Sequence, residues 1–151
     1  MDITGEYRLK GQIEDVWRDL NDPEVLKVCI PGCKSLDQTG DNEFSAEVVA
    51  KFGPVKATFK SQLRVEESNP PHSYRLVGEG KGGAAGFGKG GADVELVGED
   101  GGTLLKYDAN VAVGGKIAQI GSRLFSSTTR KLADQFFSAF AARFEDDAEQ
   151  Q

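Results

Sequence analysis

Hydrophobic residues recur at helical spacing in the last third of the chain, between Lys116 and Phe144. Most of them are three or four residues apart, which is the period of an amphipathic helix with one apolar face. That face holds Ile117, Ile120, Leu124, Leu132, Phe136, Phe140 and Phe144. The opposite face carries Arg123, Arg130, Lys131, Asp134 and Arg143. The spacing predicts one helix about 43 Å long, whose apolar face the rest of the chain must cover.

Earlier segments alternate between apolar and polar residues with a period of two, which is typical of half-exposed strands. The predicted strands begin or lie at 3–11, 44–52, 55–66, 74–77, 92–96 and 103–113. Short turns such as GP at 53–54 and SNPPH at 68–72 connect them, so the sheet is predicted to be antiparallel. We interpret the glycine-rich stretch 78–91 as β-bulges and a kink that curve the sheet, or else as the edge of a cavity mouth.

Two short helices are predicted between the first and second of these strands. The first carries Ile13, Val16, Trp17 and Leu20 at helical spacing. Asp22 followed by Pro23 predicts the cap and first turn of the second, which CIPGC at 29–33 ends. This order of elements predicts an α+β, helix-grip fold, in which a curved antiparallel sheet of about seven strands wraps around the long C-terminal helix. We expect one domain over 1–145 and an acidic, disordered tail at 146–151.

Charge and composition narrow the function classes. The 151 residues have a formal net charge of −6, and the isoelectric point is near 4.9. This balance argues against a nucleic-acid partner and against the bulk of the domain lying on an anionic lipid surface. No apolar run approaches the ~20 residues of a membrane-spanning helix, and the segment MDITGEYRLK has charges where a signal peptide needs an apolar core. With only two cysteines, these features predict a cytoplasmic protein.

Residues with chemically reactive side chains are few. His72 is the only histidine and lies in a proline-rich turn, where a surface role is expected. Cys29 and Cys33 lack the further ligands that a closed zinc site needs, so we interpret them as packing residues. GFGKGG at 86–91 precedes a strand, and neither Ser nor Thr follows Lys89, which disfavours a phosphate-binding loop. We therefore predict neither catalytic residues nor metal ligands.

Four segments resemble the CoxG family, which is named for a subunit of carbon monoxide dehydrogenase and belongs to the START-like (SRPBCC) superfamily. They are IPGC at 30–33, GFGKGGADVEL at 86–96, TLLKYDANVAVGGKIAQIGSRL at 103–124 and FFSAF at 136–140. The resemblance covers nearly the whole chain and implies a helix-grip fold with a hydrophobic cavity between the sheet and the long helix. It also implies an accessory role to molybdenum-containing carbon monoxide dehydrogenase, or to a related oxidoreductase, and recruitment of that enzyme to the cytoplasmic membrane. Longer members carry a C-terminal extension that reaches the membrane, so we expect this chain to meet the membrane indirectly or through such an extension.

Within that fold, an apolar cavity is the best candidate for a functional site, because the small residues Ala118 and Gly121 lie near the apolar face of the helix. Electrons from such an oxidoreductase end in a membrane quinone, whose isoprenoid tail suits a long apolar cavity. We therefore expect a non-enzymatic protein that requires no cofactor and binds an isoprenoid quinone such as menaquinone, or another lipid. The residues predicted to line the cavity are Val25, Leu26, Phe52, Phe59, Phe87, Val111, Ile117, Ile120, Gly121, Leu124 and Phe125.

The long helix is expected to divide in function. Its N-terminal half, Ile117 to Phe125, is predicted to form one wall of the cavity and its gate, and Leu132 to Phe144 to form plain core. Two alternatives to ligand carriage stay open. The protein is an adaptor whose pocket is filled by its own side chains, or it is a cyclase- or hydrolase-like enzyme of the same superfamily. The latter requires polar groups to converge in the cavity; the candidates are Tyr7, Tyr74, Asp93 and Tyr107.

Overall fold

In the computed structural model, the backbone is described for residues 1–149 and the side chains for residues 1–145. Seven strands form one sheet in the order β1-β7-β6-β5-β4-β3-β2, and all neighbours pair antiparallel. The strands are β1 (Asp2–Leu9), β2 (Cys33–Gly40), β3 (Glu43–Phe52), β4 (Val55–Asn69), β5 (Ser73–Lys81), β6 (Phe87–Glu99) and β7 (Gly102–Gly114). The predicted α+β architecture is confirmed, with its curved seven-stranded sheet, long C-terminal helix and two short helices after the first strand.

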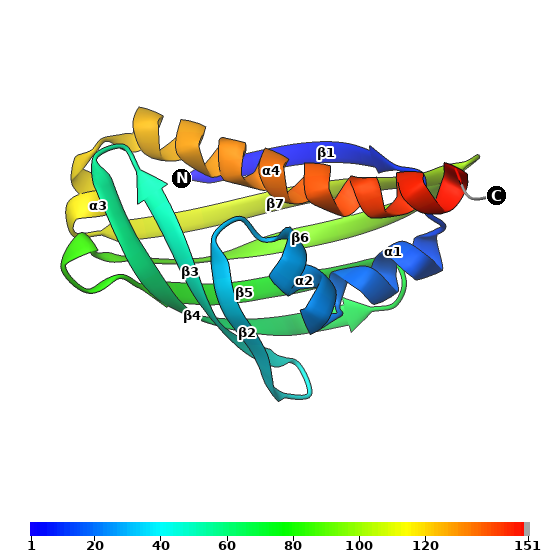
Figure 1. Ribbon diagram of the computed structural model, residues 1–151, viewed down its shortest axis with the longest axis horizontal. Coiled ribbons are helices and arrows are strands. Elements are labelled where there is room, and N and C mark those ends of the chain that lie inside the picture. Colours follow the sequence, from blue (N-terminus) through cyan, green and yellow to red (C-terminus); the bar gives the residue numbers. More distant parts are fainter. Residues whose placement is uncertain (150–151) are drawn as a thin grey trace.

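Figure 1 shows the long helix α4 running along the sheet over β1 and β7, with α1 and α2 beside its C-terminal half. The helices are α1 (Ile13–Leu20), α2 (Pro23–Cys29), α3 (Lys116–Gln119) and α4 (Ser122–Glu149), and a short 3-10 helix, η1 (Gly83–Ala85), connects β5 to β6. The predicted cap of α2 is confirmed, because the Asp22 carboxylate accepts a hydrogen bond from the Glu24 N–H at 3.0 Å.

The prediction of one continuous helix from Lys116 to Phe144 is wrong. Gly121 has φ near 94°, a left-handed conformation that glycine adopts without strain, and it separates α3 from α4. The Phe125 N–H then donates to the Gly121 carbonyl at 3.1 Å and begins the new helix. At the other end, α4 continues to Glu149 and includes part of the predicted tail 146–151. Residues 150 and 151 of that tail lie outside the described residues.

On either side of the connection 82–86, the glycine-rich stretch lies in regular strands, so the prediction of bulges there is wrong. The β5–β6 register runs without a shift from Ser73 opposite Glu95 to Lys81 opposite Phe87, and the β6–β7 register is also unbroken. Register shifts occur instead within β2–β3 and near Glu66 in β4–β5. Strand β2 itself was not predicted, because its mostly polar sequence buries only Leu36.

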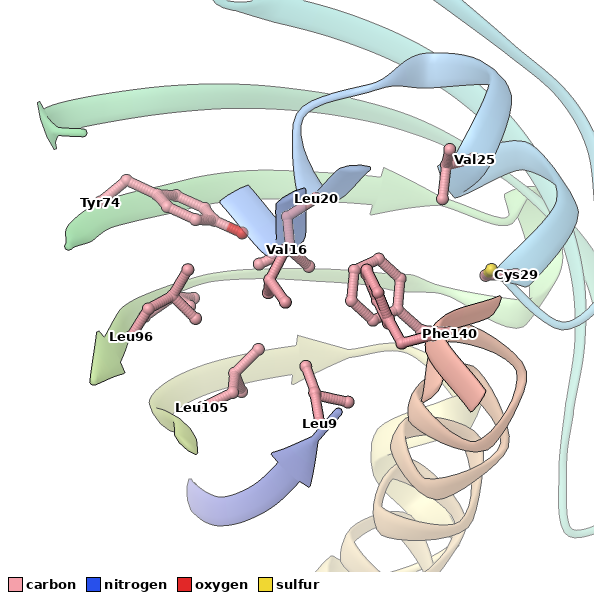
Figure 2. Packing of buried hydrophobic residues seen from close by; sticks show 11 residues of the cluster. Leu9, Val16, Leu20, Val25, Cys29, Tyr74, Leu96, Leu105 and Phe140 are labelled. Atoms are coloured by element: carbon pink, nitrogen blue, oxygen red, sulfur yellow. The ribbon is translucent and has the colours of Figure 1, made fainter. Parts of the chain in front are cut away.

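The main core lies between the sheet and the C-terminal half of α4, as predicted for that half. Phe140 is fully buried and Phe144 is nearly so. Figure 2 shows Phe140 directed among side chains of the sheet and of α1, including Leu9, Leu105 and Val16. The Asp19 carboxylate is buried beside this cluster and pairs with Arg18 at 3.3 Å and Arg143 at 3.6 Å. The pair with Arg143 connects α1 to α4.

Candidate functional site

Two neighbouring residue pairs of β5 and β6 place no side chains on the inner face of the sheet. The core residues Tyr74 and Leu76 face inward at the start of β5, so the alternation directs positions 78 and 80 inward as well. Both are glycine, and their partners across the ladder are Gly90 and Gly88. Two adjacent glycine pairs thus leave a floor of backbone only.

The hollow above this floor, here called the sheet recess, has a volume of about 310 Å³. Its lining is mainly glycine, alanine and aliphatic residues. The lining residues are Ser61, Leu63, Leu76, Gly78, Glu79, Gly80, Gly88, Lys89, Gly90, Gly91, Ala92, Ala109 and Val111. Within the part of the chain that the structure describes, this lining comes from β4 to β7 and includes no residue of α4, so the recess is an open groove. It is at the lower end of the volume range typical of small-molecule sites.

The accessible surface of the protein is larger than that of a compact monomer of the same mass. It measures 8585 Å², whereas a compact monomer of 16.2 kDa is expected to expose about 7,500 Å². A large share of apolar surface is normally removed from water by the core, so an apolar groove left open costs hydrophobic stabilisation. An apolar ligand in the groove recovers that stabilisation.

A second hollow, here called the hairpin recess, lies at the end of the molecule where α3 begins. It measures about 420 Å³. Its walls come from the β3–β4 turn, α3 and the first turn of α4. The lining residues are Pro54, Val55, Lys116, Gln119, Ile120 and Leu124. Leu124 keeps 39% of its surface exposed, although its side chain also lies over Gly53.

An aromatic cluster separates the two recesses. Phe52 stacks on Phe125 with ring centroids 5.2 Å apart and meets Phe59 edge-on at 6.0 Å. Buried Ile117 and Ala85 complete this cluster with Phe59. Phe59 borders the sheet recess, since it is the inward residue that precedes Ser61 and lies against Gly80. The rings therefore lie between the two recesses.

The predicted site residues fall into separate groups. Val111 lines the sheet recess, and Ile120 and Leu124 line the hairpin recess. Four others belong to the aromatic cluster and are not lining residues of either recess: Phe52, Phe59, Ile117 and Phe125. The segment Ile117 to Phe125 thus contributes no lining residue to the sheet recess, and its Ile120 and Leu124 line the hairpin recess instead.

The remaining predicted residues lie elsewhere. Val25 is part of the main core, and Leu26 packs against the cluster of Leu36 and Phe44 on β2 and β3. Phe87 lies at one of the alternating positions of β6 that face outward. Its side chain is 51% exposed and lies against Gly114. Gly121 makes the helix break described above. The structure brings none of these four to the sheet recess.

Sequence reasoning missed the glycines and alanines that make the sheet recess. The sequence contained a signal for this hollow. Every second residue of a strand faces the same side, so counting from the inward residues Leu76 and Val94 shows that Gly78 and Gly90 also face inward. A run of side-chain-free inward positions predicts a hollow, whereas we interpreted it first as a departure from regular pairing and only second as the edge of a cavity mouth.

A small polar cluster lies between β1, β7 and α4. The Tyr7 hydroxyl donates to the Asp134 carboxylate, and the Phe137 ring stacks on Tyr7 at 4.2 Å and on Tyr107 at 5.8 Å. Burial, together with the hydrogen bond to Asp134, raises the pKa of Tyr7 well above its usual value. Burial also raises the pKa of Tyr107. At neutral pH both hydroxyls therefore keep their protons.

The other residues with functional chemistry lie away from the recess. Asp93 is on the outer face, where its carboxylate accepts a hydrogen bond from Arg75 at 2.9 Å. His72 is exposed in the turn before β5. Cys29 is buried in the main core, and burial raises the pKa of its thiol. Among the described residues no group of three or more His, Cys, Asp and Glu side chains is placed to hold a metal ion.

The outer face of the sheet also has a hollow, a polar depression of about 720 Å³. Charged side chains such as Arg64, Arg75, Glu79 and Lys89 surround glycines at its base. Arg64 and Arg75 are paired with Glu66 and Asp93, so the depression holds mixed charges. In the described part of the chain, no helix combines the length and apolar character needed to cross a membrane.

Comparison with solved structures supports this fold. A conserved protein from Geobacillus kaustophilus shares 33% sequence identity, with a TM-score of 0.91 over 97% of this chain and 96% of that chain. A START superfamily protein from Mycobacterium smegmatis shares 14% identity, with a TM-score of 0.71 over 96% of this chain and 97% of that chain. A protein from Chromobacterium violaceum shares 16% identity, with a TM-score of 0.72 over 95% and 97% of the two chains.

No curated protein matches the chain. The family model of CoxG, a subunit of carbon monoxide dehydrogenase, matches residues 5–144, which include both recesses and most of α4. The START-like neighbour at low identity shows the same fold. The chain therefore belongs to the CoxG family of carbon monoxide dehydrogenase subunits.

Proposed function

We propose that this protein is a non-enzymatic carrier of a hydrophobic ligand, namely an isoprenoid quinone, on behalf of a molybdenum-containing oxidoreductase. The observation that supports it most directly is the apolar groove floored by Gly78, Gly80, Gly88 and Gly90. A flexible branched hydrocarbon tail matches a groove that is apolar and narrow and that contains few groups needing a partner.

Family membership supports the link to an enzyme. The family is named as a subunit of carbon monoxide dehydrogenase, and the electrons of that reaction pass to an acceptor. A quinone dissolved in the membrane is too apolar to cross water unaided. A protein that shields the tail during transfer brings that acceptor to an enzyme that is not itself in the bilayer.

The expected affinity is modest, which suits a carrier. A tail that buries about 300 Å² of apolar area gains about 7 kcal/mol at ~25 cal/mol per Å². Association costs of at least ~4 kcal/mol offset much of this gain. The remaining ~3 kcal/mol corresponds to a dissociation constant in the millimolar range. The proposal therefore includes headgroup contacts at the rim of the groove or use of the hairpin recess, which bring the affinity into the range that native mass spectrometry detects.

The experiment is native mass spectrometry of purified protein, with organic extraction of the same sample. We expect one bound isoprenoid lipid per chain, or its appearance when menaquinone is supplied in detergent. Protein that stays empty when menaquinone is offered refutes ligand carriage. A second assay measures quinone reduction by carbon monoxide dehydrogenase with quinone confined to vesicles; the proposal requires that the protein accelerates it.

The adaptor alternative is favoured by a different observation, the polar depression on the outer face. Its mixed charges are typical of protein–protein contact surfaces, where charge arrangement sets specificity. Substitution of Glu43 and Arg64, which lie opposite each other across β3 and β4 and line the depression but not the sheet recess, tests it. The adaptor function predicts loss of enzyme binding with quinone binding unchanged.

None of the four candidate residues of the enzyme alternative lines the sheet recess; these are Tyr7, Tyr74, Asp93 and Tyr107. The tyrosines near it stay protonated because the pKa of Tyr7 and that of Tyr107 are raised by burial. Asp93 lies on the opposite face of the sheet. General-base catalysis needs a group with a pKa near the working pH within reach of the substrate, and these residues do not provide one.

A further inference from the structure

Basic and acidic residues occupy different parts of this acidic protein. Three segments, 48–65, 80–92 and 109–133, contain ten of the 18 Lys and Arg residues and none of the 24 Asp and Glu residues. The remainder of the chain carries eight basic and all 24 acidic residues. The net charge of −6 is therefore the sum of a basic part, formed by the three segments, and a more strongly acidic remainder.

The fold brings the tips of these three segments together at one end of the molecule. The first segment contains the β3–β4 turn, the second contains η1 and the start of β6, and the third contains α3 and the start of α4. Pro54 and Val55 line the hairpin recess with Lys116 and Leu124, and Ala85 of η1 packs with Ile117 of α3. Figure 1 shows these elements gathered at the left end of the sheet.

Five cations lie at this end, and all five are exposed. They are Lys51, Lys56, Lys81, Lys116 and Arg123. Lys51 lies opposite Lys56 across the hairpin, so the two charges are held side by side with like sign. Among residues 1–145, none of the ion pairs includes any of these five side chains. Clustered cations with no acidic partner are stabilised by an external anion.

Exposed apolar side chains accompany these cations. Phe87 is 51% exposed and lies directly opposite Lys81 on the outer face. Leu124, which is 39% exposed, lies beside Lys116 at the hairpin recess. An aromatic or aliphatic side chain flanked by cations is the combination that peripheral proteins use at anionic bilayers, with charges at the phosphates and apolar groups below them.

We propose that this basic end, comprising the five cations with Phe87 and Leu124, docks on the anionic lipid surface of a membrane and places the hairpin recess against the bilayer. The acidic remainder is repelled by the same surface, so the charge separation orients the protein end-on. The inference rests on the proposed function for its purpose, because a carrier must meet the membrane that holds its ligand. It assigns the contact to the folded domain itself.

The test is co-sedimentation of the full chain with vesicles free of quinone. We expect binding to vesicles of phosphatidylglycerol and phosphatidylcholine in equal amounts, no binding to pure phosphatidylcholine, and weaker binding as salt is raised. Each basic residue at an anionic surface contributes ~1 kcal/mol, which is about fivefold in affinity. The double variant Lys51→Gln/Lys56→Gln should therefore bind about 25-fold more weakly.

Matched controls come from the acidic remainder. Lys34→Gln/Lys106→Gln removes the same charge from two exposed positions outside the basic end and should keep wild-type binding. Phe87→Ser should weaken binding about tenfold through lost apolar contact, whereas Val97→Ser, at a position that is 39% exposed, should not. Equal losses in the two lysine pairs, or no binding of wild type to anionic vesicles at low salt, would overturn the proposal.

The experiments distinguish failure of the docking surface from failure of the proposed carrier function. Lys51→Gln/Lys56→Gln should bind menaquinone in detergent as wild type does, since neither lysine lines a recess. Quinone binding without vesicle binding overturns only the docking surface. Vesicle binding by a protein that takes up no quinone in detergent supports the docking surface and overturns the carrier function.

Discussion

Replacing Gly88 with valine should close part of the sheet recess while making the protein more stable. A Cβ atom added at this position lies 3.5 Å from Val113 Cγ1 and 3.8 Å from the Ala112 carbonyl oxygen, which are ordinary contact distances. The backbone needs no change, because Gly88 is within a regular strand. The Cβ therefore fits without displacing its neighbours, and the valine methyl groups extend from it toward the recess.

The two effects have opposite signs and calculable sizes. Three added carbon atoms displace about three ligand carbons from apolar contact, at ~0.8 kcal/mol each. The total of about 2.4 kcal/mol corresponds to roughly 60-fold weaker binding. Glycine in a strand costs about 0.5 to 1 kcal/mol relative to alanine, and valine suits strands still better. Removal of glycine should therefore raise Tm by about 1 to 4 °C for a domain of this size.

The assay is titration of short-tailed menaquinone in detergent, followed by native mass spectrometry, with thermal unfolding of the ligand-free protein. Gly98→Val is the matched control, because Gly98 is in the same strand but a Cβ there meets nothing within 4 Å. It should bind quinone as wild type does. Wild-type affinity of Gly88→Val would refute the assignment of the ligand to this recess, and equal losses in both variants would show that the effect is not local.

Three further predictions concern the core. Phe140→Ala should lower the free energy of unfolding by about 3 to 5 kcal/mol in urea titrations, because the fully buried ring leaves a cavity; a loss below about 1 kcal/mol would contradict the packing in Figure 2. Burial raises the pKa of Tyr74 above that of tyrosine in the unfolded chain. The stability gained by burying the neutral hydroxyl is therefore complete below pH ~10, the pKa in the unfolded chain, and is lost as the pH rises further. Tyr74→Phe should therefore show a shallower decline in unfolding free energy above pH ~10, and an unchanged slope would refute this. Burial also raises the pKa of the Cys29 thiol, so Cys33→Ser should react with a thiol reagent only on unfolding, and rapid labelling of the folded variant would contradict that burial.

Periodicity was sufficient to predict the fold. Alternation identified most of the strands, and three- and four-residue spacing identified the helices, since both patterns follow from which face is buried. Periodicity failed where a strand buries few side chains or where the conformational freedom of a glycine determines the backbone. Strand β2 buries only Leu36, and the helix break depends on the positive φ of Gly121, which a hydrophobic pattern does not register.

The site was predicted less well, for a physical reason. We sought a cavity among large apolar residues, but large residues fill space, and Phe52, Phe59 and Phe125 pack on one another. The hollow lies where side chains are missing. Parity along β5 and β6 would have located it, whereas Phe87 was chosen for its hydrophobicity although its parity directs it outward.

The glycine floor has a consequence for selectivity. In the regular ladder of β5 and β6, the amide and carbonyl groups of Gly78, Gly80, Gly88 and Gly90 are committed to neighbouring strands. The floor thus offers a ligand neither hydrogen-bond donors nor acceptors. It distinguishes ligands only by the thickness and branching of their hydrocarbon tails. Tails of different length or saturation would be accepted almost alike, and discrimination between one quinone and another would have to come from the rim of the groove. Inward methyl groups added along these two strands would act as a graded steric filter without any change in polar chemistry.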